Sequence, residues 1–136
     1  MTIVGFNFTK ILAHKQKSID GKINISNKVS ITDIEQADLA LGKDKQQGVK
    51  FIFNYASKYE PDAGMIELEG DLLYLTDPKE VKTIIDEWKK SKKVPQAVMG
   101  SILNTVLTKC NIQSLIMSKD VNLPPSVQLP KVQINK

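Results

Sequence analysis

The chain has 136 residues and a net charge of +4, with 41% apolar and 25% charged residues. This is the composition of a globular protein rather than of a disordered or fibrous one. Its length predicts one domain over residues 1–136, with one hydrophobic core. All 19 basic residues are lysine, which excludes the bidentate arginine contacts typical of nucleic-acid recognition, so nucleic acid is not an expected partner.

The location of the protein is predicted from cysteine use and from the first residues. Cys110 is the single cysteine, so no intrachain disulfide can form and a reducing, cytoplasmic location is expected. Residues 1–8 lack the basic and apolar regions of a signal peptide. No stretch is apolar enough to span a bilayer, so no membrane insertion is expected.

The first half of the chain alternates apolar and polar residues, as β-strands do. Val4, Phe6 and Phe8 mark a first strand, and a shift of the pattern near Ile11 and Leu12 predicts a bulge there. A second strand covers residues 23–31. Residues 33–41 fit either a helix or a continued strand, and 42–48 are predicted to be a polar loop.

Residues 48–75 predict a long antiparallel β-hairpin. The residues Phe51, Phe53 and Tyr55 alternate with polar or smaller ones, and Pro, Asp and Gly residues in 58–64 favour a reversal of the chain. The returning strand places Ile66, Leu68, Leu72 and Tyr74 on one face and Glu67, Glu69 and Asp71 on the other.

Helical spacing follows the hairpin. Asp77 and Pro78 predict a helix start, and an apolar stripe continues to Trp88, so the helix is expected to end near Ser91. Pro95 opens a longer helix with Val98, Ile102, Val106 and Cys110 on one face, wide enough to cover a sheet and a second partner. The prolines of residues 121–136 predict an extended tail. The fold class is therefore α+β, a four-stranded antiparallel sheet followed by two helices.

Candidates for catalysis and metal binding are few. His14 is the only histidine and has no neighbouring nucleophile, so a solvated side chain is expected. Cys110 lies on an apolar helix face, where a thiol behaves as a small hydrophobe. One histidine and one cysteine cannot form a structural zinc site. We expect no enzyme activity, no metal and no cofactor.

Two charged segments have alternative interpretations. The acidic stripe, defined as Glu67, Glu69 and Asp71, is either a solvated face or a docking surface for a basic partner. The lysines of residues 89–93 complement the C-terminal end of a helix dipole or, less favoured, contact an anion. The apolar tail from Leu123 to Val132 is either a strap on the domain's own surface or one wall of a groove for apolar peptide.

Three segments carry a resemblance to a known family: FIFNYASKYEPDAGMIELEGDLLYL, SILNTVLTKC and LPPSVQLPKV. In this order they resemble the SecB family of export chaperones, and more closely its archaeal relatives. The resemblance implies a SecB-like fold, a homo-oligomer (a dimer or a tetramer), and ATP-independent holding of unfolded polypeptides. An alternative is a module that binds one partner, such as a chaperone paired with an antitoxin.

The resemblance also implies which residues would form the sites. The family docks a motor protein, SecA, through an acidic sheet surface, which would link the protein to export. In this net basic chain only the acidic stripe could form that surface. The implied peptide groove is bounded by the hairpin, the long helix and the tail, with Phe51, Phe53, Tyr55, Val98, Ile102, Val106, Leu123, Val127, Leu129 and Val132 as its lining.

Overall fold

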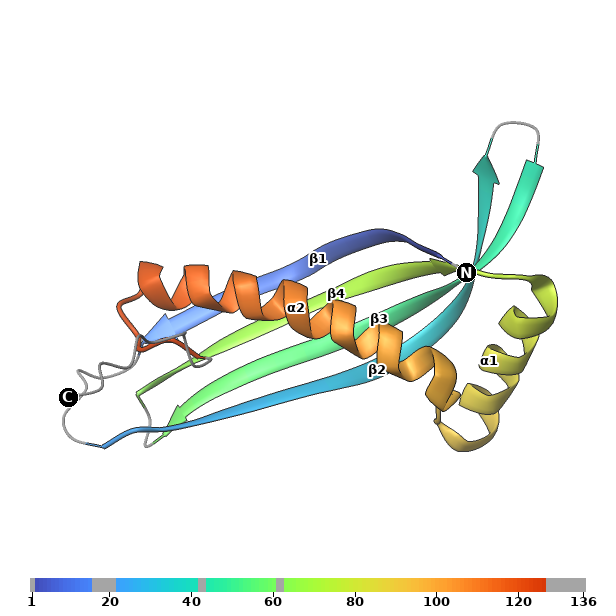
Figure 1. The fold of residues 1–136 in the computed structure, drawn as a ribbon. Helices are drawn as coiled ribbons and strands as arrows, with labels where there is room; N and C mark the ends of the chain where they lie inside the picture. The colour runs from blue at the N-terminus through green and yellow to red at the C-terminus, as the bar shows by residue number, and fades with distance from the viewer. Residues whose placement is uncertain (1, 16–21, 42–43, 61–62, 127–136) are drawn as a thin grey trace, which may run out of the picture.

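The computed structural model describes residues 2–15, 22–41, 44–60 and 63–126. Four antiparallel strands, β1 (Thr2–Lys15), β2 (Asn24–Leu41), β3 (Asp44–Glu60) and β4 (Gly64–Leu75), form one sheet in the order β1-β4-β3-β2. Two helices follow, α1 (Pro78–Ser91) and α2 (Gln96–Asp120), as Figure 1 shows. The predicted α+β layout, with the sheet first and both helices after it, is confirmed.

The central hairpin of residues 48–75 is also confirmed. Gly48 lies opposite Leu75 and Tyr59 lies opposite Gly64, so β3 and β4 pair along the whole predicted length. On β4 the predicted apolar face is buried, whereas the residues of the acidic stripe are partly exposed. Strict period-two alternation therefore located both the strands and their two faces.

The first strand differs from prediction in the position of its bulges. The register of β1 shifts between Ile3 and Gly5 and between Phe8 and Lys10, rather than near Ile11 and Leu12. Ile11 and Leu12 pair regularly with β4. The bulge between Phe8 and Lys10 has already changed which residues lie on the core side of β1, from even-numbered residues such as Phe8 to odd-numbered residues such as Ile11.

The polar loop predicted at residues 42–48 is wrong for residues 44–48, whereas residues 42 and 43 lie outside the described residues. β2 continues through residues 33–41, and β3 begins at Asp44, so regular strand pairing reaches Leu41 opposite Asp44. Of the two alternatives for 33–41, the strand is the one that forms. Residues 38–41 of β2 pair with residues 44–47 of β3, which lie beyond the pairing of β3 with β4, and these two segments form a two-stranded arm that projects from the sheet (Figure 1).

Local capping explains where α1 begins and ends. The Oδ1 atom of Asp77 accepts a hydrogen bond from the backbone N–H of Glu80 at 2.9 Å, and Pro78 occupies the first turn. At the other end Lys92 adopts a left-handed conformation (φ 57°), and its N–H bonds to the carbonyl of Trp88. Both predicted boundaries are confirmed.

We expect Asp77→Ala to lower the free energy of unfolding by about 1 kcal/mol, because an N–H at the start of α1 loses its acceptor. Urea denaturation measures this change. The exposed helix residue Lys82 supplies the control as Lys82→Ala, and a loss for Asp77→Ala no larger than this control would contradict the capping role.

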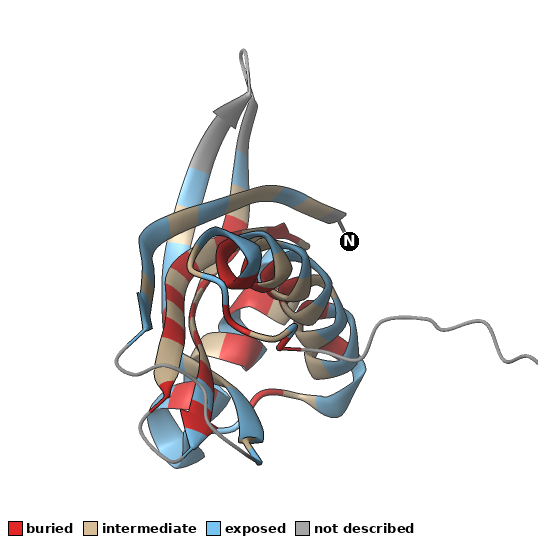
Figure 2. Ribbon diagram, turned by 90° about the vertical axis from the view of Figure 1, so that its left-hand side faces the viewer, coloured by how far each residue is buried: buried red, intermediate tan, exposed pale blue. Residues whose placement is uncertain are grey.

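The core lies between α2 and one face of the sheet. Figure 2 shows the buried residues gathered between these two layers. α2 contributes Val98, Ile102, Val106 and Cys110, all at most 5% exposed, and the sheet contributes the apolar faces of β3 and β4. α1 adds Val81, Ile84 and Trp88 at one end of the sheet.

Candidate functional site

The predicted lining of the peptide groove lies largely in this core. Phe51, Phe53, Tyr55, Ile102 and Val106 are each at most 1% exposed, and Val98 is 5% exposed. Alternation and helical spacing bring these six side chains together because they face each other across the sheet and α2. A peptide could contact them only if α2 moved. Leu123 is also buried, and Val127, Leu129 and Val132 lie outside the described residues.

Large aliphatic side chains are nevertheless exposed elsewhere. Ile11 lies opposite the buried Leu68 and therefore on the face that α2 covers, yet it is 50% exposed. α2 thus leaves part of this face open along the edge strand β1. On α2 itself, Ile112 and Ile116 stand one turn apart and are 55% and 50% exposed. The others are Val4, Leu12 and Ile25.

The chain turns back onto the sheet directly after α2. Asn122 adopts a left-handed conformation (φ 58°), its N–H bonds to the carbonyl of Lys119, and the N–H of Leu123 bonds to the carbonyl of Ser118 at 2.8 Å. This is a Schellman ending, in which a left-handed residue reverses the chain. Pro124 and Pro125 then keep the chain extended. We call residues 123–126 the strap, and Figure 1 shows their approach to the sheet.

Side chains of the sheet hold the strap by its backbone. The hydroxyl of Tyr59 donates a hydrogen bond to the carbonyl of Pro124 at 2.6 Å, and Nδ2 of Asn27 donates to the carbonyl of Ser126 at 2.8 Å. The hydroxyls of Ser126 and Ser114, both buried, bond to each other. Of the two interpretations of the tail, the described part is thus a strap on the domain's own surface.

A buried polar network positions these donors. The hydroxyl of Ser57 donates to Oδ1 of Asn27 at 2.6 Å, which fixes the amide of Asn27 with its Nδ2 toward the strap. The same hydroxyl lies 3.2 Å from that of Tyr55, which donates to Asn111 of α2. Burial is the main cause that raises the pKa of Tyr59 to about 12, so its hydroxyl stays a donor at any neutral pH.

Sequence reasoning missed the residues that anchor the strap. No sequence pattern singles out Asn27 or Ser57, and Tyr59 falls within residues 58–64, which the sequence predicts to be a reversal of the chain. One local signal was available: an asparagine directly before Leu123-Pro124-Pro125 favours a left-handed helix ending with an extended continuation.

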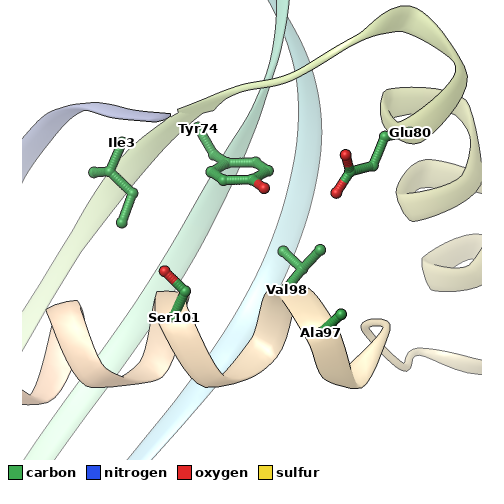
Figure 3. Close-up of a pocket in the computed structure, with 6 residues that line it drawn as sticks. All are labelled: Ile3, Tyr74, Glu80, Ala97, Val98 and Ser101. Atoms are coloured by element: carbon green, nitrogen blue, oxygen red, sulfur yellow. The ribbon is translucent and has the colours of Figure 1, made fainter. Parts of the chain in front are cut away.

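A cavity of about 380 Å³ lies at the opposite end of α2. It is formed where β1 and both helices begin and β4 ends, and Figure 3 shows its lining. Its lining residues are Ile3, Tyr74, Glu80, Ala97, Val98 and Ser101.

The chemistry of this cavity is that of a small amphipathic space. In Figure 3 the hydroxyl of Tyr74 points toward the carboxylate of Glu80, and Ser101 points up from α2. Thr76 donates a hydrogen bond to Glu80 at 2.5 Å. Burial, and then the nearby charge of Glu80, raises the pKa of Tyr74. The lining contains neither histidine nor cysteine, and so offers no activated nucleophile.

The acidic stripe is paired with lysines from the neighbouring strands. Lys10 of β1 lies 3.3 Å from Oε1 of Glu67, and Lys50 of β3 lies 3.9 Å from Oδ2 of Asp71. Nδ2 of Asn54 donates to Glu69 at 3.1 Å. The hydrogen bond from Lys10 is the main cause that lowers the pKa of Glu67. Much of the negative charge is thus balanced within the sheet.

The lysines of residues 89–93 stand around the C-terminal end of α1. Lys89 and Lys90 lie in its last turn, where the helix dipole favours them, as the capping interpretation predicted. Lys92 lies 5.3 Å from the ring centroid of Trp88. Trp88 is 8% exposed and its indole N–H donates to Asp33 at 3.3 Å, so it is packed and not offered for stacking.

His14 and Cys110, the two remaining candidates for catalysis or metal binding, lie in different environments. His14 is exposed on β1, whereas Cys110 belongs to α2 and is fully buried. Within the described ranges, no three His, Cys, Asp or Glu side chains gather as metal ligands. No described helix has the length and hydropathy to cross a membrane.

Burial raises the pKa of the Cys110 thiol to about 12, from an ordinary value of 9.0. The folded protein therefore keeps this proton at a pH where the unfolded chain loses it. The thiol contributes its full stability below about pH 9, and we expect that contribution to fall by up to about 1.4 kcal/mol per pH unit above it.

Denaturation at pH 8, 9, 10 and 11 measures this loss. Cys110→Ala should reduce the loss of stability between pH 9 and 11, because the titrating thiol is absent. An identical decline in both proteins would show that Cys110 does not titrate differently in the two states.

Comparisons with known proteins give a structural likeness but no sequence relative. No protein-family model matches the chain, and no curated protein matches it. Among solved structures, it is similar to the Mycobacterium tuberculosis Rv1957 SecB-like chaperone, solved in complex with a ChAD peptide from the Rv1956 HigA1 antitoxin. The chains are 12% identical with a TM-score of 0.49, and the match covers 99% of this chain and 92% of that one. This degree of likeness transfers no partner to this chain.

Proposed function

We propose that this protein is an ATP-independent holdase that binds unfolded or non-native polypeptides. The observation that carries the proposal is the set of exposed aliphatic side chains on the edge strand β1, namely Val4, Ile11 and Leu12. Ile11 leaves an apolar margin beside α2. The outer edge of β1, which pairs with no other strand in the described part of the chain, offers backbone groups to an extended polypeptide. Such a margin binds by apolar area and backbone pairing, which suits clients of varied sequence.

A direct test mixes the protein with a chemically unfolded client and follows light scattering. We expect slower aggregation at molar excess of the protein, together with a complex detectable by gel filtration. Unchanged aggregation without a complex would overturn the proposal. A pull-down separates the alternative: many unfolded clients support a holdase, whereas one stoichiometric partner supports a partner-specific module.

The proposed holdase also has an expected location and an expected docking surface. A holdase of this kind would act in the cytoplasm, and an export link would require a basic partner at Glu67, Glu69 and Asp71. Because Lys10 and Lys50 already neutralise much of this stripe, such a partner would have to displace them. Binding of the partner should weaken with added salt.

We also propose that the protein is a homo-oligomer, a dimer or a tetramer, that covers the outer side of α2. Ile112 and Ile116 are too exposed to stabilise the isolated chain by much. We expect the double substitution Ile112→Ser and Ile116→Ser to shift the protein toward monomer without lowering its unfolding temperature by more than a few degrees. Native mass spectrometry and analytical ultracentrifugation measure the shift. A wild-type protein that is monomeric at all concentrations would contradict the proposal.

A further inference from the structure

The strap shows how this surface binds an extended polypeptide. Both carbonyl contacts, from Tyr59 to Pro124 and from Asn27 to Ser126, are made to the backbone and do not depend on side-chain identity. They are two residues apart. Surfaces that recognise extended peptides gain affinity from hydrogen bonds to the peptide backbone and specificity from pockets for its side chains.

One apolar side chain anchors the segment. Leu123 is 6% exposed and belongs to the core cluster. A Cβ atom added to Gly64 would lie 3.1 Å from Cδ1 of Leu123, so this glycine leaves the space that the leucine fills. The anchor position is therefore formed by β4 and suits an aliphatic side chain.

The prolines match what the surface offers. In the strap, the surface supplies donors to carbonyl oxygens, and Pro124 and Pro125 carry no N–H that would need an acceptor. Proline also holds a segment extended before it binds, which lowers the entropy lost on binding. At the end of the segment the buried Ser126 contacts Ser114, and a large side chain would not fit there.

We propose that the surface beneath residues 123–126 is a peptide site, and that the chain's own strap occupies it until a foreign segment displaces it. The segments that fit are extended, with an aliphatic residue, two prolines and a small residue in succession. This inference rests on the proposed function, because it gives the holdase one defined site and one class of client. The covalent link gives the strap an effective concentration in the millimolar range, so a foreign segment must compete with it.

The competition can be measured in the wild-type protein. The probe is the capped peptide Val-Asn-Leu-Pro-Pro-Ser, which repeats residues 121–126, and the matched control peptide has both prolines replaced by alanine. At millimolar concentration, we expect the probe to accelerate hydrogen exchange of the Leu123 amide at least about three-fold. The control peptide should have a much smaller effect. No acceleration by the probe would overturn the inference.

Two substitutions distinguish competition by the strap from binding of the probe at the site. Leu123→Ser weakens the strap and should tighten binding of the probe about ten-fold, because the strap no longer competes well. Adding Tyr59→Phe to this variant removes a donor of the site and should weaken probe binding again. Because Leu123 is buried, thermal unfolding must first show that its variant is folded; if it is not, the exchange measurement on the wild type with the probe and its control peptide decides. Equal probe affinity in Leu123→Ser with and without Tyr59→Phe would contradict the site.

The same proteins distinguish failure of this inference from failure of the proposed function. If the wild type suppresses client aggregation but the probe neither binds nor accelerates exchange at Leu123, the holdase stands and the strap site is overturned. If the probe displaces the strap but no client is held by wild type or Leu123→Ser, the site stands and the holdase is overturned.

Discussion

Gly70→Ala is expected to lower the free energy of unfolding by about 3 kcal/mol or more, which would leave much of the protein unfolded. Gly70 lies in the middle of β4, between β1 and β3. A Cβ atom there would collide with the backbone carbonyl of Asn7 and would lie 2.8 Å from the ring of Phe53. Because the backbone of Asn7 lies on one side and the buried ring of Phe53 on the other, no small movement of a flexible side chain can relieve the clash.

Gly100→Ala is the matched control. Gly100 is exposed on α2, and a Cβ atom there would meet nothing within 4 Å. Because glycine costs helix stability, this substitution should stabilise the protein by about 0.5–1 kcal/mol. Urea denaturation of both variants measures the difference. A loss below about 1 kcal/mol for Gly70→Ala would show that β1 does not approach β4 so closely.

Phe53→Ala is expected to cost about 3–5 kcal/mol, because it empties the centre of the core. The ring of Phe53 is fully buried, and it stacks on Phe6 with a centroid distance of 5.1 Å. Phe8 contacts it edge-on at 6.2 Å. Loss of the ring therefore also removes the aromatic contacts through which β3 holds the edge strand β1.

The control for this prediction is Ile116→Ala, since Ile116 is half-exposed on α2. Its effect on the monomer should stay within about 0.5 kcal/mol. A double variant, Phe53→Ala with Gly70→Ala, should lose less than the sum of the two single losses, because the two positions are in contact. Strict additivity would mean that the clash of Gly70→Ala is with Asn7 alone.

The predicted groove and the observed core use the same side chains. Alternation on β3 and helical spacing on α2 identify residues that face an apolar partner, but the pattern is the same whether that partner is a peptide or the chain itself. In the described residues the partner is the chain itself, since α2 covers Phe51, Phe53 and Tyr55. Burial, which decides between these possibilities, depends on contacts between segments distant in sequence.

Some features were determined by the sequence alone. Period-two alternation established the hairpin of residues 48–75 and the two faces of β4, because a strand's side-chain period is fixed by backbone geometry. Asp77 and Pro78 established the start of α1, because capping is a local interaction.

Other features were decided only by the tertiary structure. Residues 33–41 had no dominant period, and pairing with β3 made them strand. The strap needed a left-handed Asn122 together with donors from Asn27 and Tyr59, which lie 99 and 65 residues before Ser126 and Pro124 in the chain.

 Local propensity carries no information about contacts over such separations, because they form only when the sheet and α2 have packed. For this reason the sequence determined the elements and their faces, whereas the tertiary structure decided which apolar and polar surfaces the chain covers with its own residues.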